Sequence, residues 1–142
     1  MITFKIKSGL EGYELTKDLR EEYLGTGKAD AFEESAIHIA GFEHGKAICA
    51  GRMYILDAMT CMIDNVIVDN DNRLQYVGDT ILRAFEDRAV QLARAFIKVI
   101  PTEESRGFFL AEGYEGEKEM RKNLAIIRGC RGCGGHKKWA HL

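Results

Sequence analysis

A strand, a turn and a helix follow one another between residues 63 and 92, and this segment constrains the fold most. The β-branched run at 66–68 suits a buried strand, and the Asp/Asn cluster at 69–72 ends it. Apolar residues then recur at helical spacing: Ile81, Leu82, Phe85, Ala89 and Leu92. A helix that begins directly after a turn points unpaired backbone N–H groups outward at the positive end of its dipole. The segment therefore predicts a site for phosphate.

Short strands and helices alternate along the rest of the chain. The period-two pattern of residues 2–7 predicts a half-exposed strand, and the only proline, Pro101, ends an apolar run. The expected elements are a strand at 2–7, a helix ending near 25–27, strands at 35–42, 46–56 and 59–68, the helix described above, a strand at 96–100 and a helix at 102–111. The order β-α-β-β-β-α-β-α predicts an α/β fold, with one mixed sheet and helices on both faces.

Two motifs carry a resemblance to a known family. Arg73-x-x-Tyr76-x-Gly78, followed by Ile81-Leu82 and closed by Ala89, resembles the acetyl-CoA signature of the GNAT superfamily of N-acetyltransferases. The segment 108–114 resembles the family's Phe-Tyr-x-x-x-Gly-Phe, with Gly113 as the left-handed helix terminator. The resemblance spans roughly residues 2–114 in element order. It implies a GNAT-like central mixed sheet flanked by helices, in which the parallel strands 61–68 and 96–100 splay apart at the coenzyme site.

The resemblance implies acetyl-CoA as the cofactor. Pantetheine would insert like an extra strand, its amides pairing with the backbone of the strand that ends at Val68, and the turn and helix start would hold the pyrophosphate. The residues implied at the coenzyme are Val66, Ile67, Val68, Arg73, Leu74, Gln75, Tyr76, Val77, Gly78, Asp79, Thr80 and Phe109.

Three of these residues depart from the family pattern. Tyr76 stands where the family usually has Gly. Phe109 stands where the family has a Tyr that often acts as the acid and reprotonates the coenzyme thiolate. Asp79 places a carboxylate close to the expected pyrophosphate. That carboxylate has two interpretations, a favourable helix cap or a group that weakens coenzyme binding.

Acetyl transfer to an amine requires a neutral amine, donors for a developing oxyanion and a proton for the departing thiolate. Asp64 is the predicted base, because it lies on the motif strand and is expected to share side-chain parity with Val66 and Val68. Its alternatives are a surface charge or a partner for a nearby Arg. The oxyanion donor is expected to be a main-chain N–H near Val66 or Ile67. The proton donor is left open between Tyr114, Tyr76 and water, and Tyr114 is the side chain assigned to that role.

Residues 11–34 are acidic, with eight Asp or Glu residues against three Lys or Arg residues. In the GNAT family this region walls the acceptor pocket, so an acidic wall would attract a cationic amine. A solvated helix face is the alternative explanation. We expect His38, on an apolar strand, to be a buried histidine with satisfied hydrogen bonds, and His44, at a turn, to be exposed to solvent.

The chain has 142 residues, 46% of them hydrophobic, and a net charge of −2, which fits a single domain at residues 1–128. Cys49 and Cys61 lie in apolar strands and are expected to be buried thiols.

The sequence has no long apolar run and no charged-then-apolar leader, so we expect a cytoplasmic location and no membrane contact. Nucleic-acid binding is not expected, and a homodimer is left open.

Residues 129–142 form a basic tail that contains Cys130, Cys133, His136 and His141. These groups could form a zinc site or a disulfide, but a mobile basic tail is the favoured interpretation and no metal is assigned. The sequence as a whole predicts an N-acetyltransferase that acts on a primary amine of a small molecule or peptide. The alternatives are a catalytically degenerate acyl-CoA-binding or interaction module of the same fold, and a zinc- or redox-responsive regulator whose tail carries the function.

Overall fold

A computed structural model describes residues 1–69 and 76–125 of the chain. Within them a six-stranded sheet has the order β1-β2-β3-β4-β5-β6, and the β4–β5 pair is parallel while its other neighbours are antiparallel. The predicted mixed sheet is therefore confirmed. The elements are β1 (Thr3–Ser8), α1 (Gly9–Leu24), β2 (Ile37–Glu43), β3 (Lys46–Ile55), β4 (Thr60–Val68), α2 (Val77–Gln91), β5 (Phe96–Val99), α3 (Glu103–Ala111) and β6 (Met120–Asn123).

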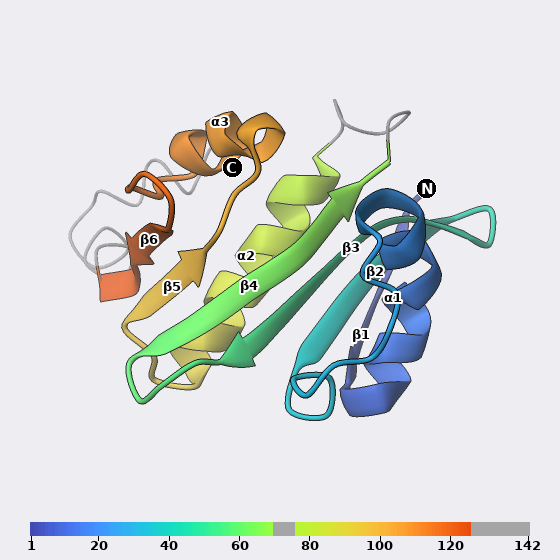
Figure 1. The fold of residues 1–142 in the computed structure, drawn as a ribbon, viewed down its shortest axis with the longest axis horizontal. Helices are drawn as coiled ribbons and strands as arrows, with labels where there is room; N and C mark the ends of the chain where they lie inside the picture. The colour runs from blue at the N-terminus through green and yellow to red at the C-terminus, as the bar shows by residue number, and fades with distance from the viewer. Residues whose placement is uncertain (70–75, 126–142) are drawn as a thin grey trace.

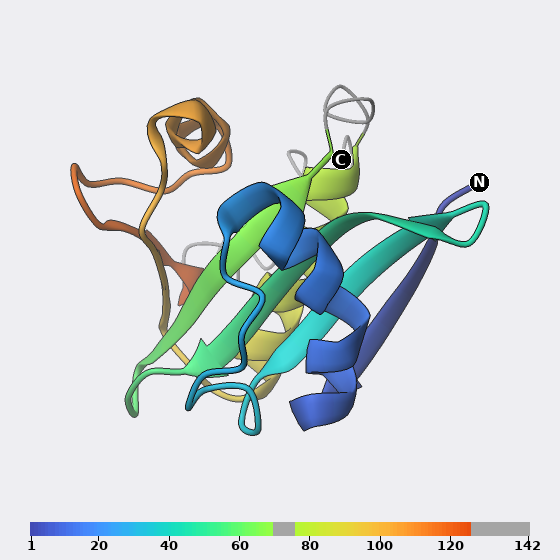
Figure 2. The same cartoon turned by 45° about the vertical axis from the view of Figure 1, so that its right-hand side comes forward.

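The two long helices cover opposite faces of the sheet (Figures 1 and 2). α2 lies on the face that carries the main apolar core, where Ile81 and Phe85 pack with Ile39 and Met53 of the central strands. On the face of α1 a smaller cluster joins Leu19, Ala50 and Ile67. The prediction of helices on both faces is confirmed, and the α1 face keeps only a small apolar cluster beside a group of buried charges.

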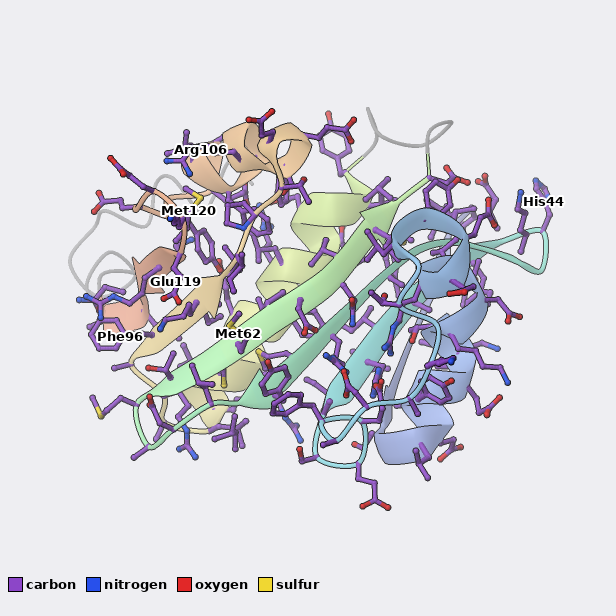
Figure 3. The ribbon with its side chains drawn as sticks, viewed as in Figure 1. His44, Met62, Phe96, Arg106, Glu119 and Met120 are labelled. Carbon is purple, nitrogen blue, oxygen red and sulfur yellow. The ribbon has the colours of Figure 1, made fainter. Side chains whose placement is uncertain are left out.

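Local signals end the first helix and form the β2–β3 hairpin where the sequence predicts them. α1 stops at Gly25, which adopts a left-handed conformation with φ of 66°. The β2–β3 turn uses His44 and Gly45 at φ of 54° and 77°, the positive values that favour a tight hairpin. Figure 3 shows His44 at the tip of this hairpin, and the residue is exposed as predicted.

The elements around Pro101 also follow their sequence signals. β5 ends at Val99, and Thr102 then caps the start of α3 through two reciprocal hydrogen bonds. The Thr102 hydroxyl accepts a bond from the Ser105 N–H at 3.1 Å, and the Ser105 hydroxyl accepts one from the Thr102 N–H at 2.9 Å. Gly113 ends this segment with a positive φ of 95°, as expected.

One strand, β6, is absent from the sequence-based expectation. It has only four residues, and three of them are Arg, Lys or Asn, so no alternating apolar pattern marks it. Its pairing with β5 and the full burial of Met120 stabilise it instead (Figure 3).

Cys49 and Cys61 are free, buried thiols, as predicted. In the part of the chain that the structure describes, no helix has the length and apolar character needed to span a membrane. The predicted tail at 129–142, with Cys130, Cys133, His136 and His141, lies outside the described residues.

Candidate active site

The β4–β5 pair separates partway along β4. Cα partners run from Thr60–Phe96 to Ile63–Val99, after which β5 ends and β4 continues to Val68. The parallel strands therefore diverge over residues 64–68, on the side where α2 begins. A gap of this kind exposes the backbone edge of β4, which can pair with an extended ligand.

A β-bulge interrupts β4 at the same place. Ala50 pairs with Ile67 and Arg52 with Asp64, so two residues of β4 lie opposite the single residue between them on β3. Asn65, inside the bulge, has a positive φ of 50°. A bulge leaves its extra residue outside the regular ladder of hydrogen bonds.

The bulge makes the predicted side-chain parity of β4 wrong. Val66 and Val68 pack against the main core on the α2 face. Asp64 instead lies on the α1 face, where it lines a pocket with the end of α1. A strand alternates faces with a period of two residues, and the extra residue in the bulge reverses the alternation between Asp64 and Val66.

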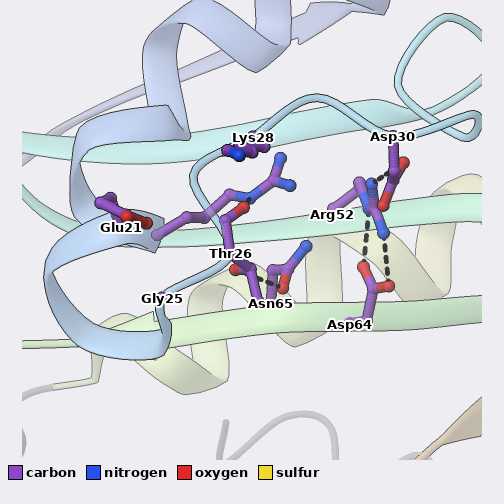
Figure 4. Close-up of a pocket in the computed structure, with 9 residues that line it drawn as sticks. Glu21, Gly25, Thr26, Lys28, Asp30, Arg52, Asp64 and Asn65 are labelled. Atoms are coloured by element: carbon purple, nitrogen blue, oxygen red, sulfur yellow. Dashed lines mark hydrogen bonds and ion pairs between the residues drawn. The ribbon is translucent and has the colours of Figure 1, made fainter.

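A pocket of about 320 Å³ opens between the end of α1, the following loop and the bulge of β4 (Figure 4). The residues that line it are polar or charged, except Gly25. The lining residues are Arg20, Glu21, Gly25, Thr26, Lys28, Asp30, Arg52, Asp64 and Asn65. At an exposed position of this pocket the Thr26 hydroxyl lies 3.2 Å from the side-chain carbonyl oxygen of Asn65, which ties the loop after α1 to the bulge.

Arg52 is the centre of an ionic cluster beneath this pocket. Its side chain is 4% exposed, and its Nε and Nη2 donate to the two carboxylate oxygens of Asp64 at 2.8 and 2.6 Å. Its Nη1 donates to Asp30 at 2.7 Å and lies 3.1 Å from Glu33. Asp64 is therefore paired with an Arg, which is one of the alternatives predicted for it, and its role as a base stays a prediction.

Arg20 completes the ionic cluster from α1. It donates two parallel bonds to Glu33, at 3.0 and 2.9 Å, and both side chains are 1% exposed. Burial would raise the pKa of Glu33, but the bonds from Arg20 and the charge of Arg52 outweigh it and lower that pKa. The same balance of burial against Arg52 lowers the pKa of Asp30. The two arginines thus favour the charged form of Glu33 and Asp30.

His38 lies at the inner edge of the ionic cluster and is completely buried. Its Nε2 is 3.4 Å from the Glu33 carbonyl oxygen, whereas its Nδ1 has no hydrogen-bond partner within residues 1–69 and 76–125. The predicted burial of His38 is confirmed, but within the described residues Nδ1 lacks the hydrogen bond that was predicted for it. Burial lowers the pKa of His38, and the nearby Arg52 and Arg20 contribute in the same direction.

The first turn of α2 lies beside the divergent end of β4. Tyr76 precedes the helix and is 83% exposed, Val77 is buried in the core, and the Thr80 hydroxyl donates to the Tyr76 carbonyl at 2.9 Å. A Cβ placed on Gly78 would come within 3.4 Å of Phe108 and 3.7 Å of Val68. The predicted coenzyme residues Arg73, Leu74 and Gln75 lie outside the described residues.

Asp79 pairs with a charged side chain of its own helix. It lies 3.4 Å from Arg83, one turn later on α2. Burial, followed by the contact with Asp79, raises the pKa of Glu112 to about 7. Glu112 is not among the candidates chosen from the sequence, because its surroundings depend on tertiary packing.

Phe109 and Tyr114 belong to the core beside this turn. Phe109 is 4% exposed and contacts the Tyr114 ring edge to face. Tyr114 is 1% exposed, and its hydroxyl donates to Glu86 at 2.9 Å, while Lys122 lies 3.2 Å from the same carboxylate. Burial, followed by the Glu86 charge, raises the pKa of Tyr114. Its role as a proton donor stays a prediction, and it would require this buried bond to open.

The structure thus separates the predicted site residues by face. Val66, Gly78 and Asp79 lie with α2, whereas Asp64 lies with α1 in the charged pocket. Sequence reasoning missed the cluster around Arg52. An Arg within the apolar run 48–55 is the one sequence signal for it, because a charge in a buried strand requires partners.

No protein-family model matches the chain. Several solved structures do match its fold. Escherichia coli ElaA is 15% identical, with a TM-score of 0.70 over 87% of this chain and 100% of that chain. An aminoglycoside 6'-N-acetyltransferase complexed with coenzyme A is 11% identical, with a TM-score of 0.66 over 87% of this chain and 97% of that chain.

A GNAT family acetyltransferase from Elizabethkingia anophelis with acetyl-CoA bound is 14% identical, with a TM-score of 0.59 over 86% of this chain and 97% of that chain. The chain has the fold of the GNAT acetyltransferases.

Proposed function

We propose that the chain is an N-acetyltransferase that transfers an acetyl group from acetyl-CoA to an amine of a small molecule or peptide. The observation that carries this proposal is the meeting of two features at the bulge of β4. On one side β4 diverges from β5 and faces the first turn of α2. On the other side a charged pocket reaches Asp64 and Asn65. Two ligands bound on these sides would meet at the bulge.

The residues at the start of α2 fit a coenzyme of this kind. Gly78 has no side chain to cover the helix start, and the first N–H groups of a helix lack partners within the helix. Nearby, Nη2 of Arg83 is buried without a hydrogen-bond partner among the residues that the structure describes, and its Nε lies 3.4 Å from Asp79. The backbone of 66–68, Tyr76–Thr80 and the preceding Arg73 would hold the coenzyme, and bound acetyl-CoA would supply an activated acetyl thioester.

The charge of the ionic cluster supports a cationic acceptor. Arg20 and Arg52 supply two positive charges, and Asp30, Glu33 and Asp64 supply three negative charges. Glu21 and Lys28, which also line the pocket, cancel each other. The surplus carboxylate would attract an ammonium group from solution. Asp64 would then receive the amine and accept its proton, a role for which Arg52 fixes the position of the carboxylate.

The backbone at the bulge supports a second catalytic role. A main-chain N–H of Val66 or Ile67 would donate to the acetyl oxygen as negative charge develops on it. The proton donor remains open between Tyr114, Tyr76 and water. Tyr76 is the exposed hydroxyl of the two, beside the helix start.

Calorimetric titration with acetyl-CoA and with free CoA tests the coenzyme site directly. We expect both to bind, because the helix start contacts the pyrophosphate that they share. A screen of amines and peptide N-termini would then identify the acceptor. Binding of CoA without any reactive amine would favour a catalytically degenerate binding module, and no binding up to millimolar concentration would reject both functions.

The role of Asp64 is tested by Asp64→Asn with an amine found in that screen. We expect turnover to fall about 10²-fold or more while acetyl-CoA affinity stays nearly unchanged, because the carboxylate acts only on the amine. Asp18→Asn, at an exposed position of α1, is the matched control and should keep full turnover. An Asp64→Asn enzyme with unchanged turnover would show that Asp64 serves only as the partner of Arg52.

A further inference from the structure

The bulge of β4 directs two neighbouring side chains into the same pocket. Successive residues of a regular strand point to opposite faces of the sheet. Asp64 and Asn65 do not, because the bulge and the positive φ of 50° at Asn65 interrupt the alternation, and both side chains line the pocket between α1 and β4. A carboxylate and a carboxamide from adjacent residues therefore share one wall of this pocket (Figure 4).

The accessible negative charge of the pocket comes from Asp64 and Asp30. Their side chains are 30% and 45% exposed, whereas Glu33 and Arg20 are each 1% exposed and bonded to each other. Arg52 bonds to both accessible carboxylates, so these three groups together carry one net negative charge. A carboxylate oxygen can accept further hydrogen bonds besides those from an arginine. This part of the pocket therefore fits an ammonium group.

Lys28 and the amide of Asn65 supply the opposite character. Lys28 is exposed, lines the pocket and forms no ion pair with any residue in 1–69 or 76–125. The side-chain oxygen of Asn65 accepts the bond from the Thr26 hydroxyl, so its Nδ2 is left as a donor that bonds to no described residue. Figure 4 shows this nitrogen directed away from Thr26. An ammonium group and an amide N–H both donate to carboxylates.

Two carboxylates could oppose an anion at Lys28, and each has another partner. Asp30 accepts from Arg52 at 2.7 Å, and Glu21 accepts from the backbone N–H of Gly27 at 3.1 Å. Figure 4 shows Glu21 on the side of the pocket away from Asp64. Among the described lining residues, Lys28 therefore remains the cation that a ligand can reach.

We infer that the acceptor is a zwitterionic small molecule of the α-amino acid class, whose ammonium group binds at Asp64 and whose carboxylate binds at the Asn65 amide and Lys28. An α-amino acid carries its two charged groups on one carbon atom, and the pocket offers partners for them on adjacent residues. This inference rests on the proposed function, because it names the acceptor of that reaction. It also narrows the function, since a peptide N-terminus has an amide in place of the free carboxylate.

The size and lining of the pocket agree with such a ligand. Its volume of about 320 Å³ lies at the lower end of the ~300–1,000 Å³ that is typical of small-molecule sites. The lining residues offer hydrogen bonds and charges rather than an apolar surface. A small, polar acceptor is therefore favoured over a long or apolar one.

Binding in this orientation places the amine for transfer. Asp64 takes one proton from the ammonium group, and the neutral amine then forms a bond to the acetyl carbon as the bond between that carbon and the coenzyme sulfur breaks. The nitrogen loses a second proton, which balances the proton that the coenzyme sulfur gains as it leaves as a thiol. The carboxylate of the acceptor takes no part in these steps and serves only in binding.

Steady-state kinetics with acetyl-CoA and matched amines test this inference. Each common amino acid is compared with its amide and with its decarboxylated amine, so that the carboxylate is the group that changes; serine, serinamide and ethanolamine form one such set. For the best set we expect kcat/KM to be about tenfold or more higher for the amino acid, because the carboxylate adds charged hydrogen bonds. Intrinsic reactivity predicts the opposite order for the amide, whose amine loses its proton more easily.

Two variants test the residues assigned to the carboxylate. Lys28→Met should raise KM for the amino acid about tenfold with kcat nearly unchanged, and should leave KM for the amide as in the wild type. Asn65→Asp keeps an oxygen for the Thr26 hydroxyl and tolerates the positive φ, but it places a negative charge at the carboxylate of the ligand. It should abolish the preference for the amino acid over its amide, a ratio in which effects common to both ligands cancel.

Lys46→Met is the matched control, because Lys46 is an exposed lysine at the β2–β3 hairpin and does not line the pocket. It should keep the wild-type preference. Equal or higher kcat/KM for the amides or decarboxylated amines would overturn the inference, as would a preference that survives in both Lys28→Met and Asn65→Asp. An acceptor found only among amines without a carboxylate would also overturn it and leave the proposed function standing. Absence of acetyl-CoA binding, or of transfer to any amine, would instead overturn the proposed function.

Discussion

At the scale of single residues, the candidate acceptor pocket depends on Arg52. Strand pairing aligns His38, Arg52 and Asp64 as successive partners across β2, β3 and β4, so their side chains share one face. The guanidinium of Arg52 then reaches carboxylates from β4 and from the loop after α1. It determines the position of Asp64 and compensates the charges of its buried neighbours.

Replacement of Arg52 should strongly destabilise the protein. Arg52→Met removes the bonds to Asp30 and Asp64 and leaves Glu33, which is 0% exposed, with one fewer cation. We expect the free energy of unfolding to fall by about 3–5 kcal/mol, the range for breaking a buried ion pair. Urea denaturation measures this free energy of unfolding. The control Lys28→Met, at an exposed position of the same pocket, should change the free energy of unfolding by less than about 0.5 kcal/mol.

Adding Glu33→Gln to Arg52→Met supplies a further check. Removal of the opposing charge should recover part of the lost stability, because the carboxylate would no longer be buried beside a missing partner. If the double variant is less stable than Arg52→Met alone, Arg20 by itself compensates Glu33, and the loss in Arg52→Met comes from Asp30, Asp64 or packing.

These residues also mark the limit of sequence-based prediction for the site. Asp64 could be chosen from the sequence, because it lies on the motif strand. The neighbours that the structure gives Asp64 could not be predicted, because they depend on the register of β2, β3 and β4 and on a bulge in β4, a strand without Gly or Pro. Asn65 takes the positive φ at that bulge, and Asn tolerates this conformation without being specific for it.

At the scale of elements, the sequence predicts most of the helices and strands. Strong periodicity and Gly or Pro signals mark the end of α1, the β2–β3 turn and the break between β5 and α3. β6 lacks such a signal, because its short polar sequence depends on its neighbour β5 for structure. The elements that depend on local chemistry are thus predictable, and those that depend on tertiary contacts are not.

Two helical glycines should respond in opposite ways to the same substitution. A Cβ on Gly12 of α1 would lie 2.3 Å from the Lys7 carbonyl oxygen and 2.5 Å from the His38 ring, whereas a Cβ on Gly107 of α3 would meet nothing within 4 Å. Gly12→Ala should cost about 1–3 kcal/mol of stability through overpacking. Gly107→Ala should add about 0.5–1 kcal/mol, because Ala loses less conformational entropy in a helix.

Thermal or urea denaturation of both variants measures these changes. The Gly107→Ala protein serves as the control for the general effect of Ala in a helix. A stable Gly12→Ala protein would mean that α1 can move away from β2 at little cost. The close packing of α1 on His38 would then not fix the position of Arg20 over the pocket.

At the scale of the whole molecule, the sheet separates two environments. The α2 face is an apolar core that ends at the proposed coenzyme turn, and the α1 face carries a small apolar cluster and a buried ionic cluster beneath the proposed acceptor pocket. β4 belongs to both, and its bulge directs Asp64 to one face and Val66 to the other. This arrangement lets two ligands approach one strand from opposite sides.

The buried ionic cluster should also make the stability of the molecule sensitive to acid through His38. Burial and the nearby arginines lower the pKa of this residue in the folded protein, and together they outweigh the contacts with Glu33 that raise it. The unfolded chain therefore binds a proton at a higher pH than the folded one. Stability should therefore decline as pH falls below about 6.5, the ordinary pKa of His. The contribution of His38 is at most about 1.4 kcal/mol for each pH unit below that value.

Urea denaturation between pH 5 and 8 measures this slope. His38→Asn should flatten the decline between pH 6.5 and 5, whatever its effect on stability at pH 8, because Asn does not titrate. His44→Asn is the matched control: the residue is exposed at the β2–β3 hairpin, and Asn accepts its positive φ of 54°. This control should leave the pH dependence as in the wild type. A decline that persists in His38→Asn would place the acid sensitivity elsewhere. Asp30 and Glu33, whose pKa values are lowered in the folded protein, would be the next groups to test, because their stabilisation is lost as they protonate at lower pH.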